Sequence, residues 1–322
     1  MWQSWLSAEQ SAAVDELASR AAAVDGFDPL NEEARLARAS GQGRHLLALD
    51  GEQPVGYLFH SPEHHTAQLV VDPAHRRRRI GSRLASVLAQ DSPLRLWAFR
   101  DAPAAQGFAR HHVLVEGRAL LVMAEQLSAD AVHEPGDSGS WRALSTRTAL
   151  PARYALGDGV SLRGYQLDDA PELLRVNAAA FAHHPEQGTL DAAGLAARMA
   201  ENWFDPEGLI VAVDDSGNLG SGNGSPATGH PHGNRLLGFH WTKRVGDVGE
   251  VYVIGVDPSA QGRGLGKRLL EAGLEHLAEA GCHSVILYVD SADTVAVGMY
   301  EAAGFGVAHR DVLYVPATEE RQ

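Results

Sequence analysis

One segment occurs twice in this chain, and the duplication restricts the possible folds more than any other feature. Residues 71–84 read VDPAHRRRRIGSRL and residues 256–269 read VDPSAQGRGLGKRL, with seven of the fourteen aligned positions identical and no gap. Each copy follows an alternating apolar segment and precedes a helical pattern and a further apolar strand. A solenoid would repeat within about 50 residues. The spacing therefore predicts two copies of one fold joined head to tail.

The second copy has the composition of an anion-binding loop. An apolar strand at 251–256 ends in an Asp-Pro turn, a loop with three glycines follows, and a helix begins near Lys267. Glycine permits a positive φ and a close approach of ligand to backbone. The first N–H groups of a helix are unpaired and attract anions. We expect a diphosphate here, with added positive charge from Arg263, Lys267 and Arg268.

Composition limits the class of protein. The 322 residues suffice for roughly two domains, and the formal net charge of −14 argues against a nucleic-acid or anionic-membrane surface. One cysteine, Cys282, cannot form an internal disulfide, which fits a reduced compartment. The N-terminal residues lack a basic start and a long apolar run, so we expect neither a signal peptide nor a membrane-spanning segment. We expect a cytoplasmic monomer that binds small molecules.

Breaker-rich segments divide the chain. Residues 126–158 have little periodicity, so we place domains at 1–140 and 159–322 with a linker at 141–158. A second such stretch, 214–234, reads as an insertion in a hairpin, because apolar alternation resumes after it. Short turns between early strands predict antiparallel pairs, and later β-α-β crossovers predict parallel ones. The expected fold class is α/β, with two tandem domains, each a mixed, mostly antiparallel sheet flanked by helices.

Apolar periodicity predicts the individual elements. Helices are expected near 7–24, 32–40, 77–90, 102–110, 168–181, 191–201, 263–280 and 293–303. Strands are expected near 45–50, 54–60, 65–71, 94–99, 113–123, 160–163, 208–214, 235–243, 249–256, 283–289 and 306–315.

This order of elements, with Gln261-x-x-Gly264-x-Gly266 at the start of the central helix of the second half, resembles the GNAT superfamily of N-acetyltransferases. The resemblance implies two tandem GNAT-like domains and acetyl-CoA as co-substrate, with no metal. In this family the loop and the helix start hold the pyrophosphate of acetyl-CoA. The preceding strand carries the thioester along its backbone.

A second family signature follows later in the chain. The pattern Asn-x-x-Ala-x-x-x-Tyr and then Gly-Phe appears as Asp293-x-x-Ala296-x-x-x-Tyr300 and the Gly-Phe pair at 304–305. Asp293 replaces the usual asparagine and brings a charge near the cofactor arm.

The resemblance assigns one set of cofactor contacts to each copy. In the second copy these are Ile254, Gly255, Val256, Gln261, Gly262, Arg263, Gly264, Leu265, Gly266, Lys267, Asp293, Thr294, Val295, Ala296, Val297 and Gly298. In the first copy they are Leu69, Val70, Val71, Arg77, Arg78, Arg79, Ile80, Gly81 and Ser82.

Acetyl transfer to an amine needs an amine lone pair, a polarised thioester carbonyl and a proton for the departing thiolate. Glu250 opens the strand VYVIGV and is the expected general base, directly or through a water, or the group that holds the ammonium. The resemblance assigns Tyr300 as the proton donor to the CoA sulfur. Without that context, Glu250 reads as a solvated strand end and Tyr300 as a core residue.

A narrower resemblance concerns the acceptor. The segments AAFAHHPEQGTL (179–190), ENWFDPEGL (201–209) and LLGFHWTK (236–243) resemble tandem GNAT enzymes that acetylate the cysteinyl amine of a glucosaminyl-inositol pseudodisaccharide. It implies a small-molecule thiol as acceptor. The corresponding acceptor-binding residues are Glu32, Glu186, Lys243, Glu250 and Tyr288. Two alternatives stay open: a tandem acetyltransferase for another amine, such as an aminoglycoside or a protein N-terminus, and a non-catalytic acetyl-CoA sensor.

The first copy differs where the chemistry needs particular residues. Arg79 stands at the position of Gly264, which restricts the approach of a phosphate, and the ungapped alignment sets His65 opposite Glu250. Phe108 lies near the position of the tyrosine. We therefore expect the N-terminal half to be inactive and to contribute to the substrate cleft. It either holds acetyl-CoA idly or only packs on its partner.

Three histidine pairs, at 64–65, 111–112 and 183–184, raise the question of a metal site. Adjacent residues on a strand point to opposite faces, and no cysteine or carboxylate spacing accompanies these pairs. We expect no metal.

Overall fold

The computed structural model describes residues 1–127, 154–157, 159–182, 187–215 and 235–318. The chain forms two compact units that do not follow the order of the sequence. Unit 1 comprises Met1–Leu121, Asp290–Asp293 and Ala308–Gln322, and unit 2 comprises Val122–Val289 and Thr294–Val307. No helix in the described part of the chain is long and apolar enough to cross a membrane.

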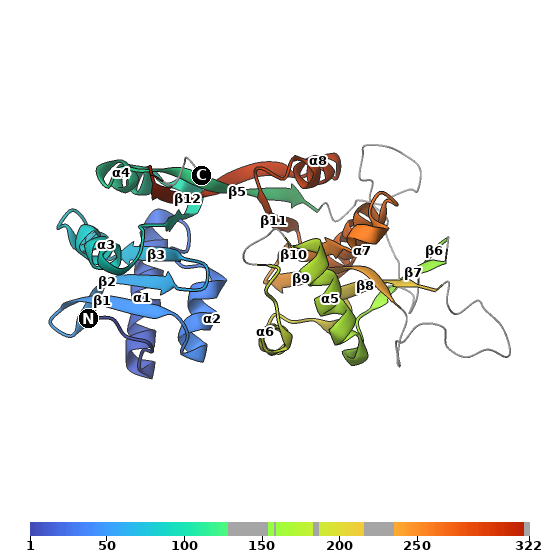
Figure 1. Ribbon diagram of the computed structural model, residues 1–322, viewed down its shortest axis with the longest axis horizontal. Coiled ribbons are helices and arrows are strands. Elements are labelled where there is room, and N and C mark those ends of the chain that lie inside the picture. Colours follow the sequence, from blue (N-terminus) through green and yellow to red (C-terminus); the bar gives the residue numbers. More distant parts are fainter. Residues whose placement is uncertain (128–153, 158, 183–186, 216–234, 319–322) are drawn as a thin grey trace. The chain divides into compact units, whose positions relative to one another are not determined.

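Unit 1 is a sheet with helices on both faces (Figure 1). Its helices are α1 (Ala8–Asp25), α2 (Glu32–Ser40), α3 (Ile80–Asp91) and α4 (Pro103–His111). Its strands follow the order β1 (Arg44–Asp50), β2 (Gln53–Ser61), β3 (Thr66–Val71), β4 (Leu96–Ala98), β12 (Gly306–Pro316) and β5 (Leu114–Gln126).

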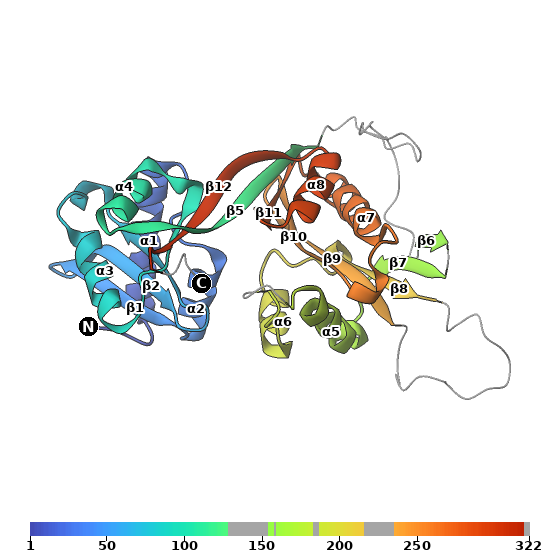
Figure 2. The same cartoon turned by 45° about the horizontal axis from the view of Figure 1, so that its top comes forward.

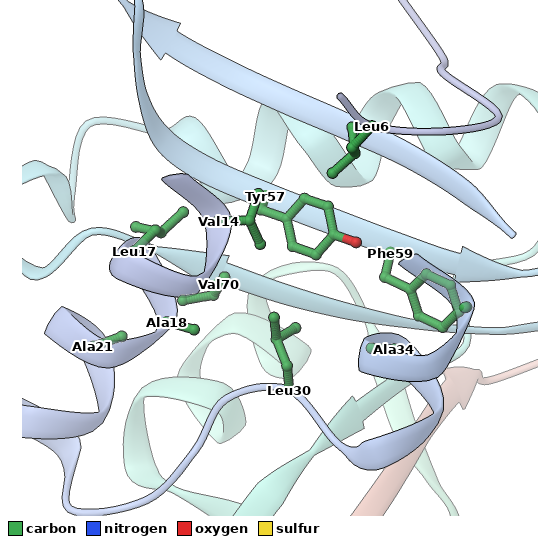
Figure 3. Packing of buried hydrophobic residues seen from close by; sticks show 11 residues of the cluster. Leu6, Val14, Leu17, Ala18, Ala21, Leu30, Ala34, Tyr57, Phe59 and Val70 are labelled. Carbon is green, nitrogen blue, oxygen red and sulfur yellow. The ribbon is translucent and has the colours of Figure 1, made fainter. Parts of the chain in front are cut away.

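Strand alternation builds the core of unit 1. On β2, Tyr57 and Phe59 face α1 and α2, where they pack with Leu17 and Leu30 (Figure 3). The intervening Leu58 belongs to the cluster on the α3 face. This two-residue alternation buries both faces of the strand, as expected for a sheet that helices cover on both sides.

Unit 2 repeats this plan. Its helices are α5 (Ala170–Ala180), α6 (Ala192–Met199), α7 (Leu265–Glu279) and α8 (Thr294–Ala302). The end of β5 is followed in the sheet by β11 (Ser284–Asp290), β10 (Val248–Val256), β9 (Leu236–Val245), β8 (Leu209–Asp214), β7 (Val160–Gly164) and β6 (Tyr154–Gly157). Helix α5 packs on one face of the central strands and α7 on the other (Figure 2).

Each unit completes its sheet with a strand from the other half of the sequence. In unit 1, β12 pairs antiparallel with β4 through Val312↔Ala98, Leu313↔Trp97 and Tyr314↔Leu96. In unit 2, the end of β5 lies beside β11, and Leu127 N donates to His283 O at 2.8 Å. The division at 141–158 therefore separates the sequence copies but not the compact units. The linker assignment is also wrong for 154–157, because these residues form β6, which pairs antiparallel with β7.

Helix α7 rests on a buried histidine. His240 on β9 is fully buried, and its Nδ1 lies 2.8 Å from Leu269 O of the helix. A Cβ on Gly273 would come within 2.1 Å of the imidazole ring, so only glycine lets the helix approach this closely. Burial lowers the pKa of His240 from 6.5 to about 4.

The buried imidazole makes the stability of unit 2 depend on pH. A folded-state pKa of about 4, below the unfolded value of 6.5, means that His240 stabilises the fold fully above pH 6.5. That contribution decreases as the pH falls from 6.5 to 4, by about 3 kcal/mol in total. Urea unfolding between pH 4 and pH 7 measures the slope, and His240→Gln is expected to flatten it. His283→Gln is the control, because it removes an exposed imidazole, and it should keep the slope. Equal slopes in the two variants would contradict the assignment.

Candidate active site

The loop of the second copy is held by a buried carboxylate. Asp257 accepts hydrogen bonds from the backbone N and the Oγ of Ser259 and forms an ion pair with Arg175 of α5 at 2.5 Å. Burial alone would raise the pKa of Asp257, but Ser259 and the Arg175 guanidinium outweigh it and hold the pKa well below its usual range. The carboxylate therefore stays ionised and fixes the turn between β10 and the loop.

The loop backbone then turns into α7 through two left-handed residues. Gly262 and Gly264 both have φ of 75°, and Gly264 is the N-cap of α7 without a side-chain cap. The first bond of the helix runs from Arg268 N to Gly264 O, so the N–H groups of 265–267 precede the helical ladder. The side chains of Lys267 and Arg268 are mostly exposed and lie within 4 Å of Glu271. The glycine loop and helix start expected from the sequence thus form an uncapped helix start behind a left-handed turn.

Strand β10 separates from β11 beside this loop. The parallel register runs from Val248↔Ser284 to Val251↔Leu287 and stops there, although β10 continues to Val256. At the same point the pairing with β9 shifts register between Val251 and Val253. Such a bulge bends a strand and redirects the side chains that follow it.

The bulge places two of the predicted cofactor residues, Ile254 and Val256, on the opposite face of β10 from the predicted base, Glu250. Tyr252 and Val253 both pack in the cluster on the α5 face, whereas Ile254 and Val256 pack in the cluster on the α7 face. Gly255 points back toward α5, where a Cβ would lie 3.3 Å from the ring of Phe181. The stretch 254–256 therefore leads into the loop before α7. Its backbone lies outside the β11 ladder.

Three predicted acceptor residues share one face of three neighbouring strands. Glu250 pairs with Lys243 on β9 and with Ile286 on β11, so these side chains point the same way. Tyr288, two residues after Ile286, points to that face as well and is 49% exposed. Lys243 Nζ lies 3.8 Å from Glu250 Oε2, with the two side chains 12% and 19% exposed.

The remaining predicted residues are distributed more widely. Glu32 is the first residue of α2 in unit 1, and Glu186 lies outside the described residues. Tyr300 is buried on α8, edge-on to Phe305. Its neighbour Met299 lies 3.5 Å from the Cβ position of Gly266, which sets α8 against the start of α7. Asp293 directly precedes α8. The predicted cofactor residues at the start of this helix differ in exposure. Ala296 and Val297 are half-buried, and the exposed ones are Asp293, Thr294, Val295 and Gly298.

Comparisons with known proteins agree with this geometry. The sequence profile of the acetyltransferase (GNAT) family matches residues 5–112 and 185–305. The mycothiol acetyltransferase of Propionibacterium freudenreichii is 38% identical to this chain, covering 98% of it and 92% of the relative. That of Rhodococcus opacus is 40% identical, covering 98% of each chain. The chain belongs to the GNAT acetyltransferases, in the group of mycothiol acetyltransferases.

This membership confirms the predicted family, the acetyl-CoA-dependent N-acetyltransferase class and the tandem α/β fold. Two solved structures have the same fold. A GCN5-related N-acetyltransferase from Sphaerobacter thermophilus gives a TM-score of 0.64 at 18% identity, covering 98% of this chain and 94% of that one. A tandem GNAT protein from the clavulanic acid biosynthesis pathway also gives 0.64, at 17% identity, with coverage of 95% and 94%.

The loop of the first GNAT copy has the same backbone path. Arg76 and Gln261 share φ of −64° and ψ of 162°, and Arg77 and Arg79 have φ of 63° and 61° where the second copy has glycine. Left-handed backbone costs an L-residue about 1–2 kcal/mol, so the surrounding turn imposes it. Arg79 therefore does not change the shape of the loop.

The contacts around this first loop also correspond. Asp72 accepts from Ala74 N and pairs with Arg20 of α1 at 2.8 Å, as Asp257 pairs with an arginine of α5. Arg76 forms two hydrogen bonds to Asp25, whereas the side chains of 77–79 are exposed. The rest of the predicted set surrounds the start of α3. Leu69 and Val71 lie within 4 Å of the Cβ position of Gly81, Val70 packs toward α1, Ile80 begins α3, and Ser82 Oγ lies 3.2 Å from His112.

The alignment of His65 with Glu250 is wrong. Counting along the ladders from Gly56↔Val71 and Gly238↔Val256, the pair Lys243↔Glu250 corresponds to Ser61↔Thr66. The bulge gives β10 one residue more than β3, and an ungapped alignment misses it. His65 itself is exposed, with φ of 53°. Unit 1 thus has two hydroxyl groups where unit 2 has an ammonium and a carboxylate.

Two features of the site were not predicted from the sequence. Arg175 and Arg20 brace the Asp-Pro turns from helices distant in the sequence. Trp203 and Tyr252 enclose the Lys243 ammonium, with ring centroids 4.9 Å and 5.1 Å from Nζ. In the described ranges, no group of three or more His, Cys, Asp or Glu side chains is placed to hold a metal ion.

Proposed function

We propose that this chain transfers acetyl from acetyl-CoA to the cysteinyl amine of a glucosaminyl-inositol pseudodisaccharide, forming mycothiol and CoA. The observation that carries the proposal is the shared face of Lys243, Glu250 and Tyr288 beside the point where β10 leaves β11. The 38–40% identity to mycothiol acetyltransferases supports the choice of acceptor. The small-molecule reaction and the lone buried thiol, Cys282, fit a cytoplasmic site of action.

The residues of the second copy suit acetyl-CoA. The uncapped N–H groups at the start of α7 and the left-handed loop at 262–264 attract the pyrophosphate. The backbone of 254–256, outside the β11 ladder, offers hydrogen bonds to the thioester arm, and Val256 N–H is the proposed donor to the carbonyl oxygen. The start of α8, at 293–298, borders the same cradle through the contact between Met299 and Gly266.

The acceptor face supplies the proton transfers. An α-amine has a free pKa of about 7.7–8.0, so part of it is already neutral near pH 7 and a modest base is enough. Glu250 takes this proton, directly or through a water, and the amine then forms the new bond to the acetyl carbon while the carbon–sulfur bond breaks. Tyr300 donates its phenolic proton to the departing sulfur. Lys243 and Tyr288 are the proposed contacts to the acceptor hydroxyls, and the family resemblance adds Glu32 and Glu186.

The acceptor is tested by a mass-resolved assay of the purified chain with acetyl-CoA and a panel of amines. The proposed acceptor, the pseudodisaccharide with its free cysteinyl amine, is called the desacetyl thiol below. An aminoglycoside and a peptide N-terminus represent the competing substrate classes. We expect kcat/KM for the thiol to exceed the others by at least about 100-fold, the discrimination that buried polar contacts provide. A higher value for either of the other amines would replace the proposed acceptor.

The base is tested by Glu250→Gln, which keeps the shape of the side chain but cannot accept a proton. We expect kcat to fall by about 10²–10⁴, the usual contribution of a positioned general base. Acetyl-CoA affinity, measured by calorimetry, should stay within a factor of two, because Glu250 lies on the acceptor face.

Tyr300→Phe provides the comparison, since it removes only the proton donor. A smaller loss confined to kcat is expected. A variant of Glu250 with normal turnover would remove this residue from the mechanism. A change of cofactor affinity alone in Tyr300→Phe would contradict the acid role.

For unit 1 we propose binding of acetyl-CoA without transfer. Its loop has the backbone of the second cradle and three exposed arginines at 77–79, which favour a diphosphate. Its ladder has Ser61 and Thr66 in place of the ion pair, and Phe108 in place of the tyrosine. Neither hydroxyl is a base at neutral pH.

Calorimetry with acetyl-CoA is expected to give two sites per chain. The combined Arg78→Glu and Arg79→Glu substitutions should reduce the number to one, because two carboxylates would repel the diphosphate. Glu250→Gln should retain both sites. A single site in the unsubstituted chain would show that the first copy is structural only.

A further inference from the structure

The ammonium of Lys243 lies in an aromatic enclosure. Its Nζ is 4.9 Å from the ring centroid of Trp203, 5.1 Å from that of Tyr252 and 3.8 Å from Glu250 Oε2. The side chain is only 12% exposed. Two π faces and one carboxylate therefore replace much of the water that an ammonium normally holds.

We propose that Trp203 and Tyr252 are positioning residues that hold Lys243 beside Glu250 and thereby set the affinity for the acceptor. The proposal rests on the proposed function for the role of this face. A lysine side chain is a compact charge on a flexible four-carbon stem, and ordering it costs rotamer entropy. Aromatic rings within about 6 Å attract an ammonium through their quadrupole. Rings on two sides hold it before the acceptor arrives.

The enclosure is itself firmly held. The Tyr252 hydroxyl accepts a hydrogen bond from Arg198 Nε at 3.0 Å, and Arg198 Nη1 donates to Gly194 O on α6. Trp241 packs against both rings, with centroids 5.9 Å from Trp203 and 5.5 Å from Tyr252. The two rings are thus fixed by α6 and by β9, which makes them suitable for holding a third group.

The two GNAT copies differ at this enclosure. In the ladder comparison, Val251 corresponds to Ala67 and Val253 to Gln68, so Tyr252 is the one residue of β10 without a counterpart in β3. The inserted residue of the bulge is therefore one of the rings around Lys243. The extra aromatic residue and the ion pair occur together in unit 2. In unit 1 the extra residue is absent from β3, and the Ser61↔Thr66 pair stands in place of the ion pair.

The predicted signature is a change in acceptor binding with little change in cofactor binding. Trp203→Leu and Tyr252→Leu should each raise the KM for the desacetyl thiol about tenfold, equivalent to about 1.4 kcal/mol. The KM for acetyl-CoA should stay within a factor of two. Trp203→Phe and Tyr252→Phe retain a π face and should keep the thiol KM within threefold of the unsubstituted chain.

Phe204→Leu is the matched control. Phe204 packs on Trp241 in the same cluster, with ring centroids 5.8 Å apart, whereas the rings over the Lys243 ammonium are those of Trp203 and Tyr252. It should lower the melting temperature as the other leucine substitutions do while leaving the thiol KM unchanged. An equal rise of KM in Phe204→Leu would mean that the cluster acts only through general packing, and the proposal would fail.

A double-mutant cycle tests whether the rings act through Lys243. In a Lys243→Ala background, Trp203→Leu should change the thiol KM less than twofold. A full tenfold effect in that background would overturn the proposal. Calorimetric titration of each variant with the desacetyl thiol alone separates this outcome from a failure of the proposed function. If the unsubstituted chain does not bind the thiol, the acceptor is wrong; if it binds and Trp203→Leu binds equally well, the positioning role is wrong.

Discussion

The arrangement of the strands in unit 2 depends on one extra residue in β10. The bulge between Val251 and Val253 ends the register with β11 and reverses which residues face α5 and which face α7. Without it, Glu250, Ile254 and Val256 would share one face by simple alternation. With the bulge, the Glu250 carboxylate lies on the same face as Lys243. The side chains of Ile254 and Val256, which precede the glycine loop, lie on the α7 face. A single inserted residue thus places the proposed base and two of the proposed cofactor residues on opposite faces of one strand.

The cofactor loop and the acceptor face depend on the sequence in different ways. The loop is a local structure: an Asp-Pro turn, left-handed residues and a helix start within fourteen residues. It tolerates Arg77 and Arg79 in left-handed backbone because the turn, held by Asp72 and Arg20, imposes the conformation. The acceptor face is assembled from three strands and the segment after α6. Exchange of two side chains suffices to remove its charges.

This difference explains what could be predicted from the sequence. Strong periodicity located most helices and strands to within a few residues, with β6 as an exception, and the glycine loop predicted the left-handed turn before α7. Register was not accessible in the same way, because a bulge leaves no composition signal. The His65 alignment failed at that point. The exchange of β5 and β12 between the units was missed for a related reason, since strand partners far apart in sequence are chosen by the sheet and not by local propensity.

The two units share a sheet plan but differ in the side chains at the positions of Lys243 and Glu250. Each sheet contains a strand from the other half of the sequence, so loss of either copy would leave the remaining sheet incomplete. The fold therefore requires both copies even if only one performs the transfer. Substitutions at the positions of Lys243 and Glu250 remove charges without removing a ladder position, because Ser61 and Thr66 still pair as strand residues. The strand residues that complete each sheet thus differ from the proposed proton-transfer residues, so the proposed site can change without loss of the ladder.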